Sequence, residues 1–416
     1  MNYKNTIEFA KELDAKDELR KYRKEFHIPL QKNGEEHIYM CGNSLGLQPK
    51  RTKEFLNQEL EDWAILGVEG HFHAKNPWMP YHEFLSDSYA KIVGAKSSEV
   101  VAMNTLTVNL HLMMVSFYRP NEKRHKIIIE GDAFPSDIYA VESQLEHHGF
   151  SSESSLIKLK PRDRETCIST KDIQKIIEKE GEKIALIMLG GVNYYTGQVF
   201  EFEKITKLAH QKGIMVGFDL AHAAGNIKLE LNKWGVDFAI WCSYKYLNSG
   251  PGSIGAAFIH EKHHQRNLPR FAGWWGHKKE ERFKMLDKFI PINTAEGWQL
   301  SNPPILSLAA IRASLSIFDE VGMEKLVSKS KKLTDYLLYL LNTIETDRIK
   351  IITPKERGCQ LSIQVKNGDK NLFNKITKKG IVADWREPDV IRIAPVPLYN
   401  SFTDVFNFYS ILKEVL

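Results

Sequence analysis

The chain has 416 residues, of which 43% are hydrophobic and 26% are charged, and this composition is typical of a globular protein. Lysine and arginine number 57 against 52 aspartate and glutamate residues, and no dense basic run indicates a nucleic-acid-binding protein. A chain of this length can bury a substantial core, so we expect one larger and one smaller domain.

Between about residues 100 and 260 the sequence alternates short apolar runs with helical patterns. The apolar runs lie at 127–129, 156–159, 184–189, 214–220, 238–242 and 255–259, and the helical patterns lie at 136–148, 171–179 and 201–211. Strands separated by helices of this length predict an α/β fold with a mainly parallel sheet covered on both faces. Ligands of such sheets bind at the carboxyl ends of the strands.

The rest of the chain predicts a second, smaller α+β unit. A long helix begins near Pro304, strands follow at 349–353, 360–365 and 390–394, and a final helix covers 402–416. The first sixty residues are predicted to be mainly helical and to pack with this smaller unit. We therefore divide the chain into an N-terminal segment (1–60), a large domain (61–303) and a small domain (304–416).

The pattern of apolar residues and cysteines bears on location. Residues 1–26 are charged and lack the apolar core of a signal peptide, and no apolar run has the length of a membrane span. The four cysteines show no metal or redox spacing, which favours a reducing compartment. The pairs His71 with His73 and His263 with His264 lack a further ligand at zinc-site spacing. We expect a cytoplasmic protein with no membrane segment and no metal.

One glycine motif, at 250–255, matches the dinucleotide-binding fingerprint in its letters. That fingerprint requires a strand before it and a helix after it. Here a β-like apolar run follows, so the helix start that would bind pyrophosphate is missing. We expect a tight turn instead.

Two predicted strands end near residues of opposite charge. The run at 214–220 ends around Asp219, and the run at 238–242 is followed by Lys245, which Tyr244 and Tyr246 flank. Either residue alone would more often be an exposed surface residue. If both point into one pocket, they place an acid and an amine around a flat, electron-poor ring. Pyridoxal phosphate needs these two groups, an amine for a Schiff base and an acid that keeps the ring nitrogen protonated.

Two further segments could complete such a pocket. Polar residues at 103–109 lead into a helical run and could bind a phosphate, although such a pattern taken alone is more often an ordinary capped helix. Phe134 and Asp137 lie in a turn after a predicted strand, where the ring could stack on a cofactor and the acid could join the polar network around it.

Six segments taken together resemble the kynureninase family. They are residues 134–137, 218–222, 241–248, 273–276, 301–304 and 391–399, and the likeness extends from about residue 40 to residue 399. The resemblance implies the aspartate-aminotransferase-like fold type I of pyridoxal phosphate enzymes, with a mainly parallel seven-stranded sheet in the large domain. It also implies a homodimer in which the partner chain completes each active site.

The resemblance assigns roles to individual residues. Lys245 is the Schiff-base lysine, Asp219 binds the ring nitrogen, and Phe134 stacks on the ring. The other cofactor-binding residues are Leu106, Thr107, Pro135, Ser136, Asp137, His222, Tyr244, Trp274 and Asn302, with Trp274 supplied by the other subunit. The family carries Ser or Thr where this chain has Gly190, so a side-chain hydroxyl is absent there.

The implied activity is that of a hydrolase of tryptophan catabolism and pyridine nucleotide (NAD) biosynthesis. It cleaves the Cβ–Cγ bond of L-kynurenine or 3-hydroxy-L-kynurenine to give L-alanine and anthranilate or 3-hydroxyanthranilate. Arg392 would pair with the substrate's α-carboxylate. Ser44, His71, Ser301 and Asn302 would line the substrate site, where His71 and Asn302 could bind a ring hydroxyl. His71 could also be an ordinary loop histidine.

Several alternatives stay open at this point. Tyr244 could shuttle a proton or only bind the phosphate. The enzyme could be another member of the same fold, such as a cysteine desulfurase or an aminotransferase. The desulfurase requires a reactive cysteine in a mobile loop. A non-catalytic sensor that keeps the cofactor fold would tolerate loss of Lys245 or Arg392, and both are present.

Overall fold

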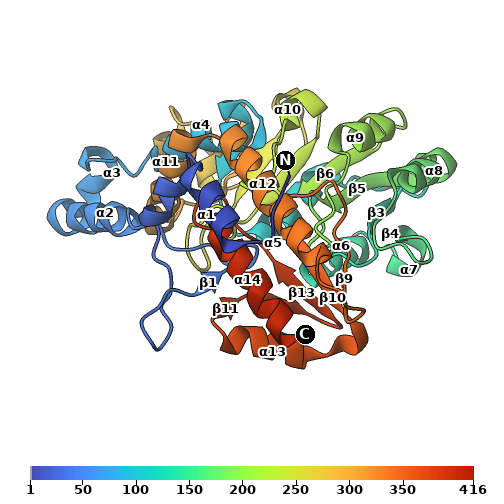
Figure 1. The fold of residues 1–416 in the computed structure, drawn as a ribbon. Helices are drawn as coiled ribbons and strands as arrows, with labels where there is room; N and C mark the ends of the chain where they lie inside the picture. The colour runs from blue at the N-terminus through green and yellow to red at the C-terminus, as the bar shows by residue number, and fades with distance from the viewer. Residues whose placement is uncertain (1) are drawn as a thin grey trace.

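A seven-stranded sheet runs through the larger part of the protein in the computed structural model, which describes residues 2–416 (Figure 1). The strand order is β2-β8-β7-β6-β5-β3-β4. Strands β3 to β7 are parallel, whereas β8 is antiparallel to both β7 and β2. The strands are β2 (Val100–Ala102), β3 (Lys126–Glu130), β4 (Leu156–Leu159), β5 (Ile184–Gly190), β6 (Met215–Asp219), β7 (Phe238–Trp241) and β8 (Ala256–Ile259). The predicted mainly parallel sheet is therefore confirmed.

Helices cover both faces of this sheet, and successive residues of a strand pack to opposite sides. Ile127 and Ile129 of β3 pack in one hydrophobic cluster with residues of α5 and α6, while Ile128 packs in another with residues of α8 and α9. Since the inner strands β5, β6 and β7 are buried on both faces, their residues are apolar almost without interruption. The helices around the sheet are α4 (Ser86–Val93), α5 (Leu106–Phe117), α6 (Pro135–His147), α7 (Ser152–Ser155), α8 (Thr170–Glu180), α9 (Phe202–His210) and α10 (Leu231–Trp234).

A four-stranded antiparallel sheet of order β12-β13-β10-β9 forms the smaller unit. A third hydrophobic cluster, separate from the two around the large sheet, lies between this smaller sheet and helices α12 and α14. A two-stranded parallel ladder joins β1 to β11. The elements are α11 (Ile305–Val321), α12 (Met323–Asn342), β9 (Ile349–Ile351), β10 (Leu361–Val365), α13 (Lys370–Lys378), β11 (Ile381–Val382), β12 (Asp384–Arg386), β13 (Val390–Ile393) and α14 (Phe402–Val415).

The N-terminal sixty residues are less helical than predicted. They contain α1 (Ile7–Ala15), a 3₁₀ helix at Arg20–Glu25, β1 (Ile38–Tyr39) and the beginning of α2 (Thr52–Leu66). Between Phe26 and Arg51, prolines and glycines such as Pro29, Gly34 and Pro49 interrupt any helix. Helix α1 packs against α14, and α2 packs against α11. Helices α2 and α3 (Gly70–His73) extend away from the rest of the chain in Figure 1. The domain boundaries stay a prediction.

Two sequence expectations concern local features. The glycine motif at 250–255 forms a turn that leads directly into β8, so the helix that a dinucleotide would need does not follow it. Of the helices between residues 2 and 416, none combines the length and apolar character that a membrane crossing requires.

The amino end of β7 contains a buried carboxylate that several donors satisfy. Asp237, only 1% exposed, accepts hydrogen bonds from the Val216 amide at 2.8 Å, from His210 Nε2 at 2.9 Å and from His263 Nε2 at 2.8 Å. Lys262 Nζ lies 2.8 Å from the same group. Burial alone would raise the pKa of Asp237, but these donors hold it well below its usual range.

We predict that Asp237→Asn lowers the free energy of unfolding by about 3 kcal/mol at neutral pH, because it leaves buried donors and a lysine without their anion. Since the folded pKa is depressed, this stabilisation is present above the unfolded value of about 3.9 and is lost as pH falls below it. Urea unfolding at neutral and acidic pH measures the difference. Asp347→Asn, at an exposed ion pair with Lys366, is the control and should change little. Equal stability of Asp237→Asn and the parent at neutral pH would contradict the prediction.

Candidate active site

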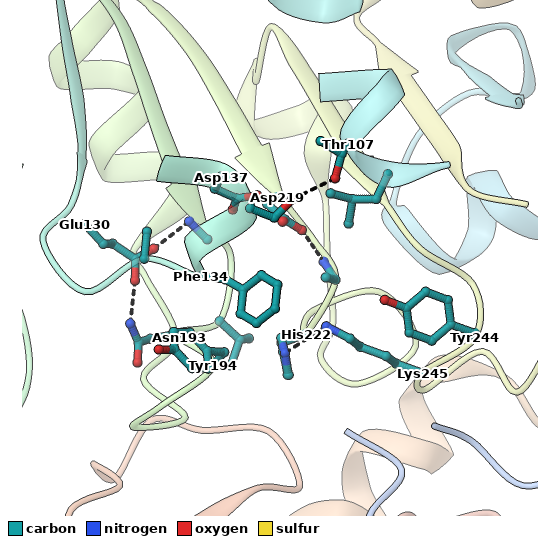
Figure 2. Close-up of a pocket in the computed structure, with 16 residues that line it drawn as sticks. Thr107, Glu130, Phe134, Asp137, Asn193, Tyr194, Asp219, His222, Tyr244 and Lys245 are labelled. Atoms are coloured by element: carbon teal, nitrogen blue, oxygen red, sulfur yellow. Dashed lines mark hydrogen bonds between the residues drawn. The ribbon is translucent and has the colours of Figure 1, made fainter. Parts of the chain in front are cut away.

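A cavity of about 170 Å³ lies at the carboxyl ends of strands β3, β5 and β6 (Figure 2). The loop that follows β7 forms another of its walls. The last residues of three strands line it, namely Glu130, Gly190 and Asp219. In the sheet, Gly190 is paired with Asp219, and Asp219 is paired with Ile240 of β7. The position agrees with the general rule for ligand sites in parallel sheets.

Asp219 and Lys245 both line this one cavity. Asp219 Oδ1 accepts a hydrogen bond from the Ala221 amide at 2.6 Å. Lys245 Nζ lies 3.0 Å from His222 Nε2. Burial, and then the charge of Lys245, lower the pKa of His222 well below its usual value, so the imidazole is neutral and can accept a hydrogen bond from the lysine.

Two further buried acids accompany Asp219. Burial and the nearby Asp219 raise the pKa of Asp137 well above its usual range, so that Asp137 keeps its proton. Burial also raises the pKa of Asp219, although Lys245 and the Ala221 amide oppose this. Burial raises the pKa of Glu130 to about 7. The cavity therefore holds more acid groups than cations, and a cationic N–H group placed in it would stabilise the ionised form of Asp219.

Two helices begin at the cavity. Helix α5 starts at Leu106 and helix α6 starts at Pro135, and neither has a side-chain hydrogen bond at its N-cap residue. The hydroxyl oxygens of Thr107 and Ser136, one from each helix, lie 2.8 Å apart. Hydroxyls beside free amide groups at helix starts are a favourable environment for a phosphate. Pro135 does not line the cavity itself.

An aromatic ring occupies the space between the acids and the lysine. Phe134 is 47% exposed, and Figure 2 shows its ring between Asp219 and Asp137 on one side and His222 and Lys245 on the other. Lys245 Nζ lies 6.0 Å from the ring centroid. The Tyr194 ring is almost perpendicular to it, with the centroids 5.5 Å apart. Phe134 thus presents a flat face on which a planar ligand can stack.

Arg392 lies close to the cavity but does not line it. It is 1% exposed on β13, where Nε donates to Asp384 Oδ1 at 3.0 Å and Nη1 donates to the Tyr194 carbonyl oxygen at 2.9 Å. Its Nη2 is buried without a hydrogen bond, although it lies 2.9 Å from the same Asp384 oxygen. Nη2 is therefore held in an ion pair with Asp384 and still has hydrogen-bonding capacity for an incoming anion.

Besides Pro135 and Arg392, five more of the predicted site residues do not line the cavity. His71 is on α3, Trp274 is 42% exposed and donates its Nε1 hydrogen to the Arg282 carbonyl at 2.9 Å, and Ser301 and Asn302 are exposed. Ser44 follows β1, two residues before a contact with the Lys245 loop. None of the five lines the cavity. Their roles stay predictions.

Among the polar residues of the cavity wall, sequence reasoning missed Glu130, Asn193 and Tyr194. One signal was present, because Glu130 ends a predicted parallel strand, where ligand-binding residues concentrate. Gly190 donates its amide hydrogen to Glu130 Oε1 at 2.6 Å. This N–H is therefore already bonded to protein and does not point freely into the cavity.

Comparison with known proteins places the chain in a family. A sequence model described as the kynureninase C-terminal domain matches residues 326–412. A protein named kynureninase from Koribacter versatilis is 55% identical over 98% of this chain and 97% of the relative. Another, from Flavobacterium psychrophilum, is 55% identical over 100% and 99%, and one from Myxococcus xanthus is 53% identical over 99% and 97%. This chain belongs to the kynureninase family.

Kynureninases use pyridoxal phosphate, and the cavity fits this cofactor. The ring would stack on Phe134, the phosphate would meet the starts of α5 and α6, and the aldehyde would face the amine of Lys245. Burial raises the pKa of Asp219 despite the nearby Lys245. A protonated ring nitrogen beside Asp219 would therefore stabilise its ionised form.

Solved structures of other proteins share the fold. The cysteine desulfurase from Thermococcus onnurineus NA1 has a TM-score of 0.77 at 19% identity and covers 95% of this chain and 97% of its own. The cysteine desulfurase CsdA from Escherichia coli has a TM-score of 0.77 at 15% identity, covering 95% and 98%. The expected fold type I architecture is thereby confirmed.

The cysteines do not favour desulfurase chemistry. Burial raises the pKa of the Cys41 and Cys359 thiols to about 12. It also raises the pKa of Cys167 and Cys242, and Cys242 is buried beside the sheet. A nucleophilic cysteine needs a lowered pKa and an accessible thiolate. The likeness to the desulfurases is therefore one of fold.

The Lys245 loop is supported by the N-terminal segment, which allows a test. The Gly46 amide donates to the Tyr244 carbonyl at 2.8 Å, and a Cβ atom at Gly46 would collide with the Lys245 carbonyl oxygen and the Asn248 side chain. We predict that Gly46→Ala displaces Lys245 and lowers the rate of substrate cleavage by about ten- to a hundredfold. Steady-state assays of cofactor-loaded protein measure this.

A matched control is Gly34→Ala, in a turn where no atom lies close to an added Cβ. This change strains a residue with positive φ by about 1 kcal/mol but leaves Lys245 in place. If Gly46→Ala were as active as Gly34→Ala, the contact between Gly46 and the lysine loop would have no role in placing Lys245.

Proposed function

We propose that this protein hydrolyses the Cβ–Cγ bond of L-kynurenine or 3-hydroxy-L-kynurenine, with release of L-alanine and anthranilate or 3-hydroxyanthranilate. The observation that carries this proposal is the identity of 55% to proteins named kynureninase over nearly the whole chain. The cavity supports it, because an amine, an acid, a stacking ring and an anion-binding helix start surround the same space.

The bound cofactor supplies an electron-poor ring that takes up the electron pair left on the substrate's carbon. Lys245 would hold the cofactor through its aldehyde, and its amine would take up the α-proton of the substrate. His222, whose neutral imidazole lies 3.0 Å from Lys245 Nζ, orients the amine for this transfer. Asp219 keeps the ring nitrogen protonated through its buried carboxylate.

Tyr244 is the proposed proton donor during cleavage. Burial raises the pKa of its hydroxyl above the usual value, so the group stays protonated at neutral pH and can donate a proton or a hydrogen bond. It lines the cavity directly before Lys245. Binding of the phosphate alone is the other role open to this hydroxyl.

Arg392 is proposed to bind the substrate's α-carboxylate. Its buried Nη2 has no hydrogen bond, and its guanidinium lies 5.9 Å from the ring of Tyr194, which lines the cavity. A planar guanidinium suits a planar carboxylate. The side chain is already fixed by Asp384 and by the Tyr194 carbonyl, so little conformational freedom is lost on binding.

The remaining site residues are proposed to act across a homodimer. Trp274 and Asn302 are exposed and do not line the cavity of their own chain, which supports a role at the active site of a second copy. His71, Ser301 and Asn302 would then meet the aromatic ring of the substrate and favour its 3-hydroxy form. Ser44 is proposed to line the substrate site beside the Lys245 loop. The cytoplasmic location stays a prediction.

Turnover tests the function directly. Cofactor-loaded protein incubated with each substrate should release fluorescent anthranilate or its hydroxylated form. Lys245→Ala should lose the cofactor's visible absorption band and at least about a thousandfold in rate, because the group that moves the α-proton is gone. Lys171→Ala, an exposed lysine on α8, is the matched control and should keep the parent rate. Absence of product from both substrates would refute the proposal.

Shared active sites predict complementation between inactive variants. When Lys245→Ala and Asn302→Ala chains are mixed under conditions that exchange subunits, a mixed dimer has one site with both native residues. Random pairing should then restore about a quarter of the parent activity. Each variant alone should stay weak at the same total concentration. If mixing restored nothing while the chains had exchanged, Asn302 would act within its own chain.

A further inference from the structure

Glu130 is a buried acid at the cavity to which the proposed chemistry gives no role. It is 2% exposed at the end of β3. Its Oε1 accepts from the Gly190 amide at 2.6 Å, and its Oε2 accepts from Asn193 Nδ2 at 2.5 Å. One carboxylate therefore binds both the beginning and the middle of the turn that follows β5, as the dashed lines in Figure 2 show.

Asn193 in turn organises the rest of this segment. Its side-chain oxygen accepts from the Tyr195 amide at 3.0 Å, from the Thr196 amide at 2.8 Å and from the Thr196 hydroxyl at 3.0 Å. Because this oxygen is fully used, the Asn193 amide cannot turn over without losing these bonds. Its Nδ2 therefore always faces Glu130, which must offer an acceptor there.

The same turn carries the contacts to the smaller unit. The Tyr194 carbonyl oxygen accepts from Arg392 Nη1 at 2.9 Å and from Gln360 Nε2 at 3.0 Å, and the Tyr195 carbonyl accepts from the Ser362 hydroxyl at 2.6 Å. Because Arg392 Nη1 donates to the Tyr194 carbonyl oxygen, the position of Tyr194 helps to fix the orientation of the guanidinium. A chain of direct contacts leads from Glu130 through Asn193 and Tyr194 to the guanidinium.

Gly190 belongs to the same arrangement. A Cβ atom at this position would lie 2.8 Å from Glu130 Oε1, too close for an unstrained contact. The absence of a side chain at Gly190 therefore lets Glu130 approach the backbone and bond to its N–H. In this chain the carboxylate takes the space that a side chain at residue 190 would fill.

We propose that Glu130 is a positioning residue for substrate binding, which holds the turn at 190–196 so that Arg392 is aligned with the substrate's α-carboxylate. The inference rests on the proposed function for the identity of that carboxylate. It assigns no contact between Glu130 and the reacting atoms, so the residue should affect binding of the substrate much more than the rate of the bound complex.

The charge of Glu130 makes this role dependent on pH. Burial raises its pKa to about 7, hydrogen bonds from Asn193 and Gly190 oppose this, and the acids Asp219 and Asp132 raise it further. Asp137 on α6 and Glu165, across a second cavity of about 180 Å³, are the other acids that face it. As pH falls through about 7, the carboxyl gains a proton, and one of its oxygens becomes a donor that opposes an N–H group. The turn should then loosen.

The test uses L-alanine, which has an α-amine and an α-carboxylate but no bond to cleave. Its dissociation constant from cofactor-loaded protein is measured through the change in the cofactor's absorption spectrum. Glu130→Gln should raise this constant, and the KM for the substrate, by about tenfold, the factor that corresponds to one weakened hydrogen bond to a charged group. The kcat should change less than about threefold, because Lys245 and Asp219 are untouched.

The parent protein should also bind L-alanine more weakly as pH falls from about 8 to 6, because Glu130 gains its proton over this range. Glu130→Gln should lose this dependence. Glu165→Gln, which changes an exposed acid of the second cavity, is the control and should bind like the parent. If Glu130→Gln fails to fold, Gly190→Ala, whose methyl group presses on Glu130 Oε1, should produce the same rise.

Two failures are distinguishable. An unchanged dissociation constant in the variants, or a loss of kcat with an unchanged KM, would overturn the inference about Glu130. Binding of L-alanine that weakens as expected, in a protein that cleaves neither kynurenine, would support the positioning role and refute only the proposed substrate.

Discussion

The arrangement of the site depends on the burial of three acids around one lysine. Glu130, Asp137 and Asp219 lie within one small cavity, and Lys245 is the cation that shares it. Charges removed from water must be paired or neutralised, so Asp137 retains a proton and Glu130 is bound by two N–H donors. Asp219 is left as the acid that gains most from a positively charged ring nitrogen.

The sheet creates this concentration of charge. Parallel strands end at one edge, so Glu130, Gly190 and Asp219, far apart in the sequence, become neighbours at the ends of β3, β5 and β6. The first residues of α5 and α6 line the same cavity with Leu106, Thr107 and Ser136. The smaller unit contributes Arg392, which donates to the Tyr194 carbonyl in the turn after β5. This turn therefore connects the cavity with the proposed site of the substrate's carboxylate.

Much of this was predictable from the sequence, and the rest has identifiable physical reasons. The apolar runs predicted the positions of the strands. Asp219 and Lys245 were then recognised as the charged residues at or just after the ends of two of these strands. The contact of Glu130 with Asn193 was not predictable, because it joins two strand ends through side-chain geometry that no periodicity records. Strands β1, β11 and β12 have only two or three residues and exist because of their partners. Trp274 and Asn302 were assigned by resemblance, and a single chain does not bring them to the cavity.

A crystal structure of the cofactor-loaded protein tests the central claim most directly. The account predicts a covalent bond from Lys245 Nζ to the cofactor and a hydrogen bond from the ring nitrogen to Asp219. It also predicts the phosphate at the starts of α5 and α6. A cofactor whose ring nitrogen faces away from Asp219, or whose phosphate lies elsewhere, would contradict it.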